Sequence, residues 1–290
     1  MRASPTWLVT GAAGQLGREL VRVLGVREPV GTVTGLGRAD LDVTDRVAVH
    51  GAVAGLGPDV VVNCAAWTDV DGCELDPERA HRVNADAVGF LREACERAGA
   101  HLVHVSTDYV FSGEASEPYP EGHPTGPVNA YGVSKLAGEV AAGLEATVVR
   151  TAWLQSVDGA NVFRSVLSQL AEPEEVFFVD DQHGSPTFVA DLAPVILRLG
   201  VERAAGVVHA TNAGTTSWYG FACEVARASG HDPERVHPIC EDDLDASRSA
   251  RRPAYSALDN AVLRDLGYEP MRHHRDAIAD AVAGLRGEGA

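Results

Sequence analysis

Lysine is almost absent from this 290-residue sequence: Lys135 is the only one, and the rest of its 24 basic residues are arginine. Acidic residues number 41, which gives a formal net charge of −17. Such a surplus repels phosphate backbones and anionic lipids, and it argues against a nucleic-acid-binding or membrane-surface protein. A small anionic ligand is still compatible with the sequence, provided that local groups bind it.

Cysteine is also scarce, and no long hydrophobic run is present. The five cysteines are scattered, odd in number and never spaced CxxC, which argues against a disulfide scaffold or a zinc site. No apolar run approaches the length of a membrane span, and the start MRASPTWLVTG leaves no room for a signal peptide. These absences predict a cytoplasmic protein with no membrane or nucleic-acid partner.

The chain alternates short apolar runs with longer amphipathic segments, which predicts an α/β fold. Strands are expected at 6–11, 30–36, 59–66, 101–107 and 146–154, and helices at 17–25, 76–99 and 131–144. Strands separated by helices of this length form a doubly wound parallel sheet of the Rossmann type. We expect this domain to cover residues 1–152. Residues 153–290 are expected to form mainly a smaller C-terminal lobe, with segments around 176–195 returning to the first domain.

The segment TGAAGQLG places Gly11, Gly14 and Gly17 between the first strand and the first helix. Glycines at these positions let the backbone turn tightly and approach a pyrophosphate, whose charge then meets the amides at the helix N-terminus. The alternative is an ordinary glycine-rich turn, but the strand–turn–helix context favours dinucleotide binding.

The residue that follows the second strand indicates which dinucleotide is bound. A carboxylate at this place would hold the ribose 2′-hydroxyl of NADH, and an arginine would hold the 2′-phosphate of NADPH. Arg38 stands there, with Asp40 and Asp42 close behind. The sequence therefore favours NADPH, NADH remains possible, and a solvated surface arginine is the alternative for Arg38.

Tyr131 and Lys135 are four residues apart on an expected helix, so both side chains project from one face. Reduction of a carbonyl needs a proton donor, and a neighbouring ammonium would favour ionisation of a tyrosine at neutral pH. Lysine also offers three donors on a compact group, which the planar fork of arginine does not reproduce. With Thr107 at the end of the expected strand 101–107, the pair predicts a reductase site; the alternative is a surface pair on a helix.

Together these motifs resemble the extended short-chain dehydrogenase/reductase family, and more closely its dTDP-4-dehydrorhamnose reductase branch. The resemblance runs from residue 8 to about 260 in the order of that branch. It includes TGAAGQLGREL, NCAAWTDVDGCE, VHVSTDYVFSG, NAYGVSKLAGE, RTAW and DDQHGSPT. It implies NADPH-dependent reduction of the C4 keto group of a dTDP-4-keto-6-deoxy sugar, with the C-terminal lobe binding the substrate. A monomer or a homodimer is expected.

The resemblance also implies roles for individual residues. Thr107, Tyr131 and Lys135 would be catalytic, with Thr107 bonded to the keto oxygen, Tyr131 donating the proton and Lys135 holding the nicotinamide ribose and lowering the pKa of Tyr131. The cofactor would also contact a set spread over the first domain: Gly11, Gly14, Gln15, Leu16, Gly17, Arg38, Asp42, Val43, Asn63, Ala65, Ala66 and Thr68. The substrate would contact a second set: Val70, Thr107, Asp108, Tyr109, Trp153 and, at its nucleotide end, Arg252. The alternative for Arg252 is an ordinary surface arginine.

The sequence departs from this branch at a few places. The branch commonly continues RTAW with an aliphatic residue, a tyrosine and a glycine beside the sugar pocket, and this sequence has Gln155 and Ser156 there, which leaves open another dTDP-4-keto sugar, as in antibiotic biosynthesis. Some members hold Mg²⁺ with glutamates; Glu19 matches one of them, but residues 188–190 supply no second, so no metal is expected. A non-catalytic cofactor-binding subunit is the alternative from another class, and the presence of Tyr131 and Lys135 argues against it. The histidines at 273–274 are expected to be a surface pair.

Overall fold

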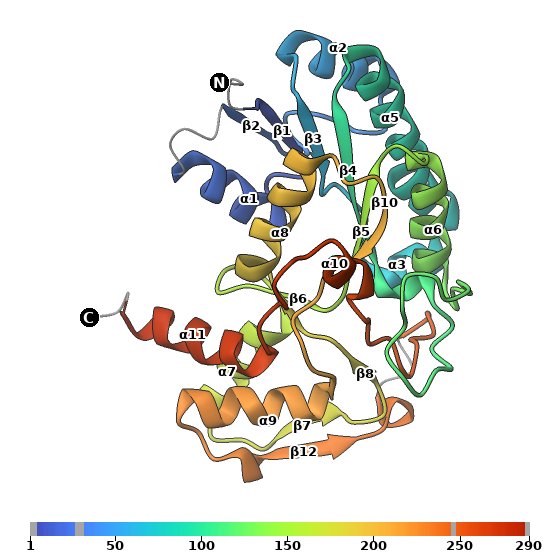
Figure 1. Ribbon diagram of the computed structural model, residues 1–290. Helices are drawn as coiled ribbons and strands as arrows, with labels where there is room; N and C mark the ends of the chain where they lie inside the picture. The colour runs from blue at the N-terminus through green and yellow to red at the C-terminus, as the bar shows by residue number, and fades with distance from the viewer. Residues whose placement is uncertain (1–4, 27–31, 245–247, 288–290) are drawn as a thin grey trace.

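The computed structural model describes residues 5–26, 32–244 and 248–287. At its centre lies a parallel sheet of six strands in the order β10-β5-β4-β3-β1-β2 (Figure 1). Every neighbouring pair in this sheet is parallel, which confirms the predicted doubly wound Rossmann fold. The strands are β1 (Trp7–Thr10), β2 (Val33–Leu36), β3 (Val60–Asn63), β4 (His101–Thr107), β5 (Thr147–Thr151) and β10 (Gly206–His209).

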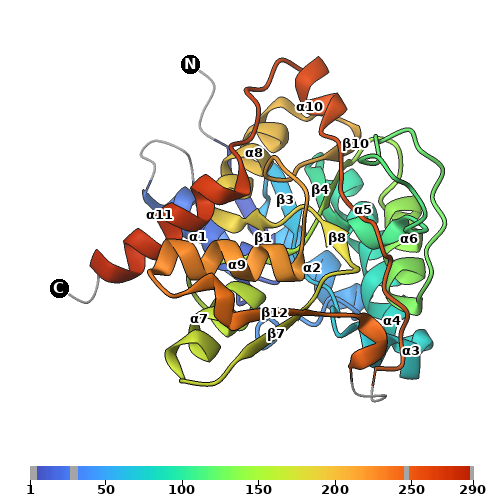
Figure 2. The same ribbon diagram turned by 90° about the horizontal axis from the view of Figure 1, so that it is seen from below.

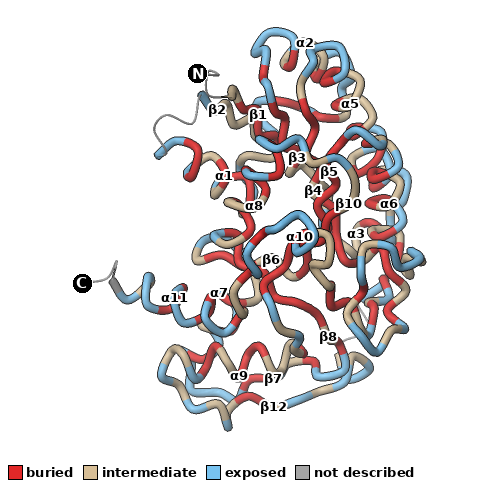
Figure 3. The backbone as a smooth tube through the Cα atoms, viewed as in Figure 1, coloured by how far each residue is buried: buried red, intermediate tan, exposed pale blue. Residues whose placement is uncertain are grey.

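Helices cover both faces of the sheet, so strands β1, β3 and β5 are buried along their whole length (Figure 3). Alternate residues of β1 show the two faces: Trp7 and Val9 join one hydrophobic core, and Leu8 joins the other. The first core is covered by α1 (Gln15–Val26) and α8 (Val189–Glu202), and the second by α2 (Arg46–Leu56), α5 (Ala87–Ala98) and α6 (Ala130–Ala142). This double coverage explains why the strand segments read as continuous apolar runs.

A smaller lobe lies beyond the carboxyl edge of the sheet (Figures 1 and 2). Its strands β7 (Val176–Val179) and β12 (Val236–Ile239) pair in parallel. Three helices pack around a separate core that contains Phe163, Phe221 and Ile278; they are α7 (Val162–Ala171), α9 (Trp218–Ser229) and α11 (His274–Gly287). Short elements connect the lobe to the sheet: β6 (Leu154–Gln155), β8 (His183–Gly184), β9 (Thr187–Phe188), β11 (Thr216–Ser217) and α10 (Ala261–Asp265).

The segment that returns to the sheet begins later than the expected 176–195. Strand β7 belongs to the small lobe, whereas α8 and β10 return to the Rossmann layer. In β7, Val176 and Val179 are buried but Phe177 is 56% exposed. A strand with one face in solvent suits a small two-stranded sheet better than a sheet covered on both faces.

The helix expected over 76–99 is interrupted by a π-helical turn. It consists of α4 (Pro77–His81), the turn Arg82–Asp86 and α5, and the short α3 (Val70–Leu75) precedes it. The turn carries the buried Asn84, which bonds both backbone polar groups of Trp67 and donates to Ser134 Oγ of α6. Turns of this kind are frequent at functional sites. Within the described ranges, no helix has both the length and the apolar character to cross a bilayer.

Candidate functional site

The carboxyl ends of β1, β3, β4 and β5 meet at a hollow of about 440 Å³, which we call the central pocket. Its lining includes Thr107, Tyr131, Lys135 and Trp153, together with the glycine loop. Parallel strands place their carboxyl ends at one edge, so residues far apart in sequence converge there. The structure thus brings the three expected catalytic residues to one pocket.

Helix α6 positions Tyr131 and Lys135. Its N-cap, Asn129, accepts a hydrogen bond from the backbone N–H of Gly132 at 2.8 Å, which fixes where the helix begins. A Cβ on Gly132 would lie 2.2 Å from the carbonyl oxygen of Tyr109. Glycine is therefore required for the close approach of this helix to the turn after β4, and that approach brings Tyr131 to Thr107.

Hydrogen bonds fix the polar groups of the central pocket. Lys135 Nζ donates to the carbonyl oxygen of Val105 at 2.7 Å, and Thr107 Oγ1 donates to Asp108 Oδ1 at 2.9 Å. Asp108 Oδ2 is buried and has no partner among the described residues. The proton of the Thr107 hydroxyl is therefore held by Asp108.

Burial sets the protonation of these groups. It raises the pKa of the Tyr131 phenol, an effect that the neighbouring Thr107 opposes, and it lowers the pKa of Lys135 to about 8. Burial also raises the pKa of Asp108 to about 6. Burial is the largest influence on the Tyr131 pKa, and the Lys135 ammonium donates to the carbonyl oxygen of Val105, so the expected lowering of the Tyr131 pKa by Lys135 stays a prediction. At neutral pH the phenol is protonated, which is the form that a proton donor needs.

A second hollow of about 430 Å³ continues from the glycine loop, and we call it the arginine pocket. It shares Gly11, Gly14, Cys64 and Ala66 with the central pocket, so the two form one elongated cleft. Arg38, Arg79 and Arg82 all line it, as do the expected Asp42, Val43 and Ala65. Three guanidinium groups suit a phosphate beyond the pyrophosphate, as NADPH carries.

The backbone of the glycine loop has the tight turn and close approach that a dinucleotide site needs. Gly11 has a φ of 66°, and a Cβ there would lie 2.6 Å from the backbone nitrogen of Ala65. The loop therefore lies directly against the segment after β3, and α1 begins at Gln15 with no acidic residue in its first turn. Gln15, Leu16, Gly17 and Thr68 line the central pocket, as expected of cofactor contacts.

Asn63 is the expected cofactor residue that lines neither hollow. It is 1% exposed, and its Oδ1 accepts from Thr10 Oγ1 at 2.7 Å and from the backbone N–H of Ala65 at 3.1 Å. Its Nδ2 lies 3.1 Å from Nδ1 of His104. Asn63 therefore stabilises the backbone turn that follows β3, and it contacts the cleft only through this turn.

A third hollow of about 310 Å³ lies toward the small lobe, and we call it the aromatic pocket. Val70, Tyr109 and Arg252, expected at the substrate, line it. Two aromatic pairs join it to the central pocket. The ring centroids of Tyr131 and Tyr109 are 5.7 Å apart in an edge-to-face contact, and those of Trp153 and Trp218 are 3.5 Å apart in a stack. Tyr131 and Trp153 line the central pocket, and their partners line the aromatic pocket.

Arg252 is held in place by Asp71. Its two terminal nitrogens reach the two carboxylate oxygens at 2.8 and 2.5 Å, and the guanidinium holds the pKa of Asp71 well below its usual range. The side chain is only 11% exposed. This excludes the solvated surface role and leaves a fixed cation at the rim of the aromatic pocket, with part of its charge already balanced.

Sequence reasoning missed several lining residues. Arg79 and Arg82 stand one helical turn apart, a visible signal, but nothing local indicates that this helix reaches the glycine loop. The small lobe contributes others, which no local pattern brings together, although one of them lies in the quoted segment DDQHGSPT; they are Phe177, Phe178, Gln182, Trp218 and Arg248.

His274 and Glu19, two further residues discussed from the sequence, lie outside the central, arginine and aromatic pockets. His274 is not a surface residue: it is 1% exposed, and its Nε2 lies 2.8 Å from Glu224 Oε2. It opens α11, which packs on α9, and this helix was not foreseen. Glu19, which matches a glutamate that holds Mg²⁺ in some members of the branch, forms an ion pair with Arg22; Arg22 Nη2 lies 2.6 Å from Glu19 Oε1.

Gln155, at the departure beside the sugar pocket, is buried and supports the backbone. Its Nε2 donates to the carbonyl of Trp153 at 3.0 Å, and its Oε1 accepts from the N–H of Phe163 at 2.8 Å. Trp153 itself has a φ of 46°, which is unusual for a large side chain. The departure therefore acts on the position of Trp153, and Gln155 does not line the central pocket.

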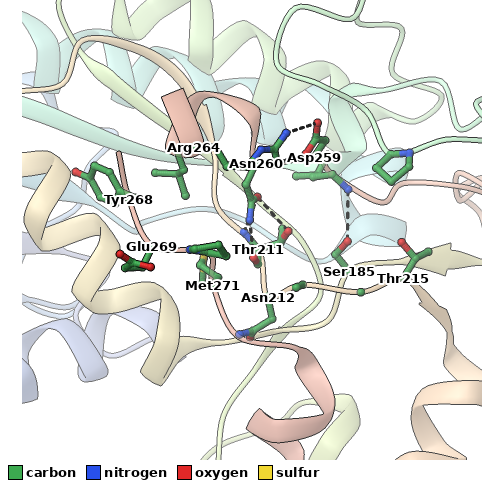
Figure 4. Close-up of a pocket in the computed structure, with 16 residues that line it drawn as sticks. Ser185, Thr211, Asn212, Thr215, Asp259, Asn260, Arg264, Tyr268, Glu269 and Met271 are labelled. Carbon is green, nitrogen blue, oxygen red and sulfur yellow. Dashed lines mark hydrogen bonds and ion pairs between the residues drawn. The ribbon is translucent and has the colours of Figure 1, made fainter. Parts of the chain in front are cut away.

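A further hollow of about 240 Å³ lies between α10 and the segment 211–215, and it shares no lining residue with the central pocket (Figure 4). Its polar side chains bond one another: Asn260 pairs with the backbone of Thr211, and Arg264 with Asp259. Ser185 accepts from the N–H of Leu258. With these groups engaged and no expected site residue present, this hollow is not the candidate site.

A Rossmann sheet with Thr, Tyr and Lys converging beside a glycine-lined cleft defines an NAD(P)-dependent oxidoreductase of the short-chain dehydrogenase/reductase type. The comparisons with known proteins narrow the class. Residues 6–286 match the family model described as RmlD substrate binding domain, and the chain belongs to this family.

Relatives within the family cover almost the whole chain. A dTDP-4-dehydrorhamnose reductase of Streptomyces griseus is 46% identical over 98% of this chain and 95% of its own. A dTDP-4-keto-6-deoxy-D-glucose reductase of Streptomyces niveus is 43% identical over 95% and 96%. Among solved structures, the dTDP-4-dehydrorhamnose reductase of Bacillus anthracis in complex with NADP is 32% identical, with a TM-score of 0.91 over 97% of this chain and 99% of that one.

Proposed function

We propose that this protein reduces the C4 keto group of dTDP-4-dehydrorhamnose with NADPH and yields dTDP-L-rhamnose. The observation that carries the proposal is the convergence of Thr107, Tyr131 and Lys135 in the central pocket, beside the glycine loop. The reductase relative at 46% identity over nearly the full length supports the same reaction. The presence of both Tyr131 and Lys135 in one pocket speaks against the non-catalytic alternative.

The residues of the cleft suit NADPH. Gly11, Gly14 and the first turn of α1 would hold its pyrophosphate, and Arg38, Arg79 and Arg82 its 2′-phosphate. Lys135 would bind the ribose hydroxyls at the nicotinamide end. When bound, the cofactor supplies a hydride to the carbonyl carbon.

The central pocket then supplies the proton and the orientation. Tyr131 is protonated at neutral pH and stands beside Thr107, so its phenol donates to the carbonyl oxygen as that oxygen gains negative charge. Thr107 is held by Asp108, which fixes the position of its hydroxyl oxygen at the wall of the pocket. Trp153 forms a wall for the sugar, locked by its stack on Trp218.

A second candidate is the same reduction on another dTDP-4-keto sugar. It is favoured by the Streptomyces niveus relative, whose name carries a different substrate at 43% identity. Gln155 and Ser156, next to Trp153, are where such a difference in substrate would arise. We also expect the protein to act in the cytoplasm as a monomer or homodimer, without a nucleic-acid or membrane partner.

The proposal is tested by mixing the protein with NADPH and dTDP-4-dehydrorhamnose and following loss of NADPH absorbance. Tyr131→Phe is expected to lower kcat by about 10³-fold or more, because the proton donor is lost, while the Kd for NADPH changes little. Tyr219→Phe, on α9 and outside the three pockets, is the control.

Two outcomes would contradict the proposal, and a third would favour the second candidate. Wild-type protein that binds NADPH but leaves this keto sugar unreduced would exclude the named substrate. Turnover of a different dTDP-4-keto sugar in the same assay would favour the second candidate. Tyr131→Phe with near-normal kcat would remove the proton-donor role.

A further inference from the structure

Trp153 has a backbone conformation that its own side chain disfavours. Its φ of 46° lies in the left-handed region, which a large residue rarely adopts. Arg203 is the other non-glycine residue with a positive φ in the described part of the chain, and it follows the end of α8, where this conformation is common. Trp153 follows no helix, so contacts with other segments must hold it in this conformation.

Two contacts fix the indole ring of Trp153. It stacks on Trp218 with the ring planes only 6° apart. A Cβ on Gly184 would lie 2.5 Å from Cε2 of the indole, so β8 leaves room for the ring only because a glycine stands there. These contacts limit where the ring can lie, but neither of them bonds the backbone of Trp153.

Gln155 bonds this backbone directly. Its Nε2 donates to the carbonyl oxygen of Trp153 at 3.0 Å, and the N–H of Thr187 donates to the same oxygen at 3.2 Å. Its Oε1 accepts from the N–H of Phe163 in the first turn of α7, where backbone N–H groups have no partner within the helix. With both ends of its carboxamide bonded and only 1% of its surface exposed, Gln155 links α7 rigidly to Trp153.

The chemistry at the two ends of Gln155 requires a carboxamide. The Trp153 carbonyl needs a donor and the Phe163 N–H needs an acceptor, and one carboxamide carries both groups. A hydrocarbon side chain of this length supplies neither, and a carboxylate supplies only the acceptor. Because the side chain is buried, water does not replace a missing partner, so these bonds hold the segment 153–155 in one arrangement.

We propose that Gln155 is a positioning residue for the wall of the central pocket. It holds Trp153 in the left-handed conformation, and through that backbone it sets where the indole lies. The indole lines the central pocket, whereas Gln155 lines neither this pocket nor the arginine pocket. Gln155 therefore acts on a bound sugar only through Trp153. Its effect on turnover rests on the proposed function, and its effect on the position of Trp153 does not.

The position of Trp153 is measured by ¹⁹F NMR of protein labelled with fluorotryptophan. The chain has four tryptophans, and single Trp→Phe variants assign their resonances. Gln155→Met keeps the length of the side chain and removes both hydrogen bonds. The Trp153 resonance should then shift or split, because the indole leaves the ring-current field of Trp218. Trp7, buried in the core between the sheet and α1, should keep its resonance, which shows that the fold is intact.

A second variant separates the position of Trp153 from the start of α7. The carboxylate of Gln155→Glu still accepts from the N–H of Phe163, and its charge is favourable at a helix N-terminus, but it cannot donate to Trp153. The Trp153 resonance should therefore shift in this variant as well, and it decides the question if Gln155→Met does not fold. Gln169→Met, on the exposed side of α7, is the matched control and should shift no resonance.

The reductase assay measures the consequence for turnover. Both Gln155 variants should lower kcat/KM for the keto sugar about 10- to 100-fold, because a displaced wall misplaces the carbonyl relative to Tyr131. The Kd for NADPH should be unchanged, since Gln155 lines neither part of the cofactor cleft. Gln169→Met should match wild type in both measurements.

The resonances and the activity bear on different hypotheses. An unchanged Trp153 resonance in the folded Gln155 variants would exclude the positioning role, and so would a shift of Trp7 together with Trp153, which would show a general loss of structure. A shifted Trp153 with normal kcat/KM would show that the position of this wall does not govern turnover. If wild type reduces no keto sugar, the proposed function fails, while the resonances still decide whether Gln155 positions Trp153.

Discussion

Arg38 shows how a single residue can set the choice of cofactor. It lines the arginine pocket with Arg79 and Arg82, within reach of the end of the cleft that the glycine loop opens. Arg38→Ala is expected to raise the Kd for NADPH about 10- to 100-fold, because a charge-assisted bond to the 2′-phosphate is lost. The Kd for NADH, which lacks this phosphate, should change little.

Fluorescence titration of both cofactors measures the effect of Arg38→Ala. Arg46→Ala removes the same charge from the exposed face of α2, where Arg46 pairs with Glu93, and serves as control. An equal loss of affinity for NADH and NADPH in Arg38→Ala would show that Arg38 does not contact the 2′-phosphate.

Helix α6 and strand β5 are joined by a buried ion pair behind the candidate site. Arg150 donates to both oxygens of Glu139 at 2.9 and 2.7 Å, and Ser106 donates to the same carboxylate at 2.6 Å. The two charged side chains are 5% and 6% exposed. The pair ties the helix that carries Tyr131 and Lys135 to the sheet.

Removal of one partner should therefore destabilise the fold. Glu139→Leu leaves the Arg150 charge buried and is expected to lower the free energy of unfolding by about 3–5 kcal/mol. Glu139→Leu/Arg150→Met should recover most of this loss, because the guanidinium left without its carboxylate partner is then also removed. Urea unfolding gives both values; a single variant as stable as wild type would be incompatible with this account.

The exposed pair Arg92–Glu96 provides the comparison for the buried one. Its side chains are 35% and 59% exposed, so Glu96→Ala should change the free energy of unfolding by less than about 1 kcal/mol. A loss as large as that of Glu139→Leu would mean that burial does not explain the difference between the two pairs.

Among the helices, strands and turns, the sequence predicted those that depend on residues near one another in the chain. The glycine loop, the αβ alternation and the spacing of Tyr131 and Lys135 depend on neighbours in the chain, and the structure places them as expected. The π-helical turn and the φ of Trp153 were not predicted. Both depend on contacts between distant segments, Asn84 with Trp67 and Trp153 with Trp218, which no local pattern encodes.

In the whole molecule, the cofactor side of the cleft could be predicted from local sequence patterns, whereas the side toward the small lobe depends on contacts between distant segments. The cofactor side is built from the edges of one regular sheet, so most of its lining residues were predicted from motifs. The aromatic pocket gathers short segments from 70 to 252 that meet only after the small lobe has packed. The sequence therefore did not predict that Gln182 and Trp218 line one pocket.

The enclosure of Lys135 between the sheet and its surroundings makes cofactor binding sensitive to pH. Burial lowers the pKa of this group from its ordinary 10.5 to about 8, so the ammonium is present below pH 8 and is lost as the pH rises through that value. NADPH affinity, which gains from the ammonium, should fall above pH 8 by up to about tenfold per pH unit. Tyr131 does not titrate in this range, since burial raises its pKa.

Stability should change in the opposite direction. The pKa of Lys135 is lower in the folded than in the unfolded protein, so folding is opposed while the group is charged, and this penalty disappears between pH 8 and 10.5. Lys135→Met should bind NADPH weakly with no dependence on pH from 7 to 9.5. Its stability relative to wild type should be highest below pH 8, because the variant buries no charge. Titrations of NADPH and urea unfolding across this range test both signs; a wild-type Kd that stays constant would show that Lys135 remains charged when buried.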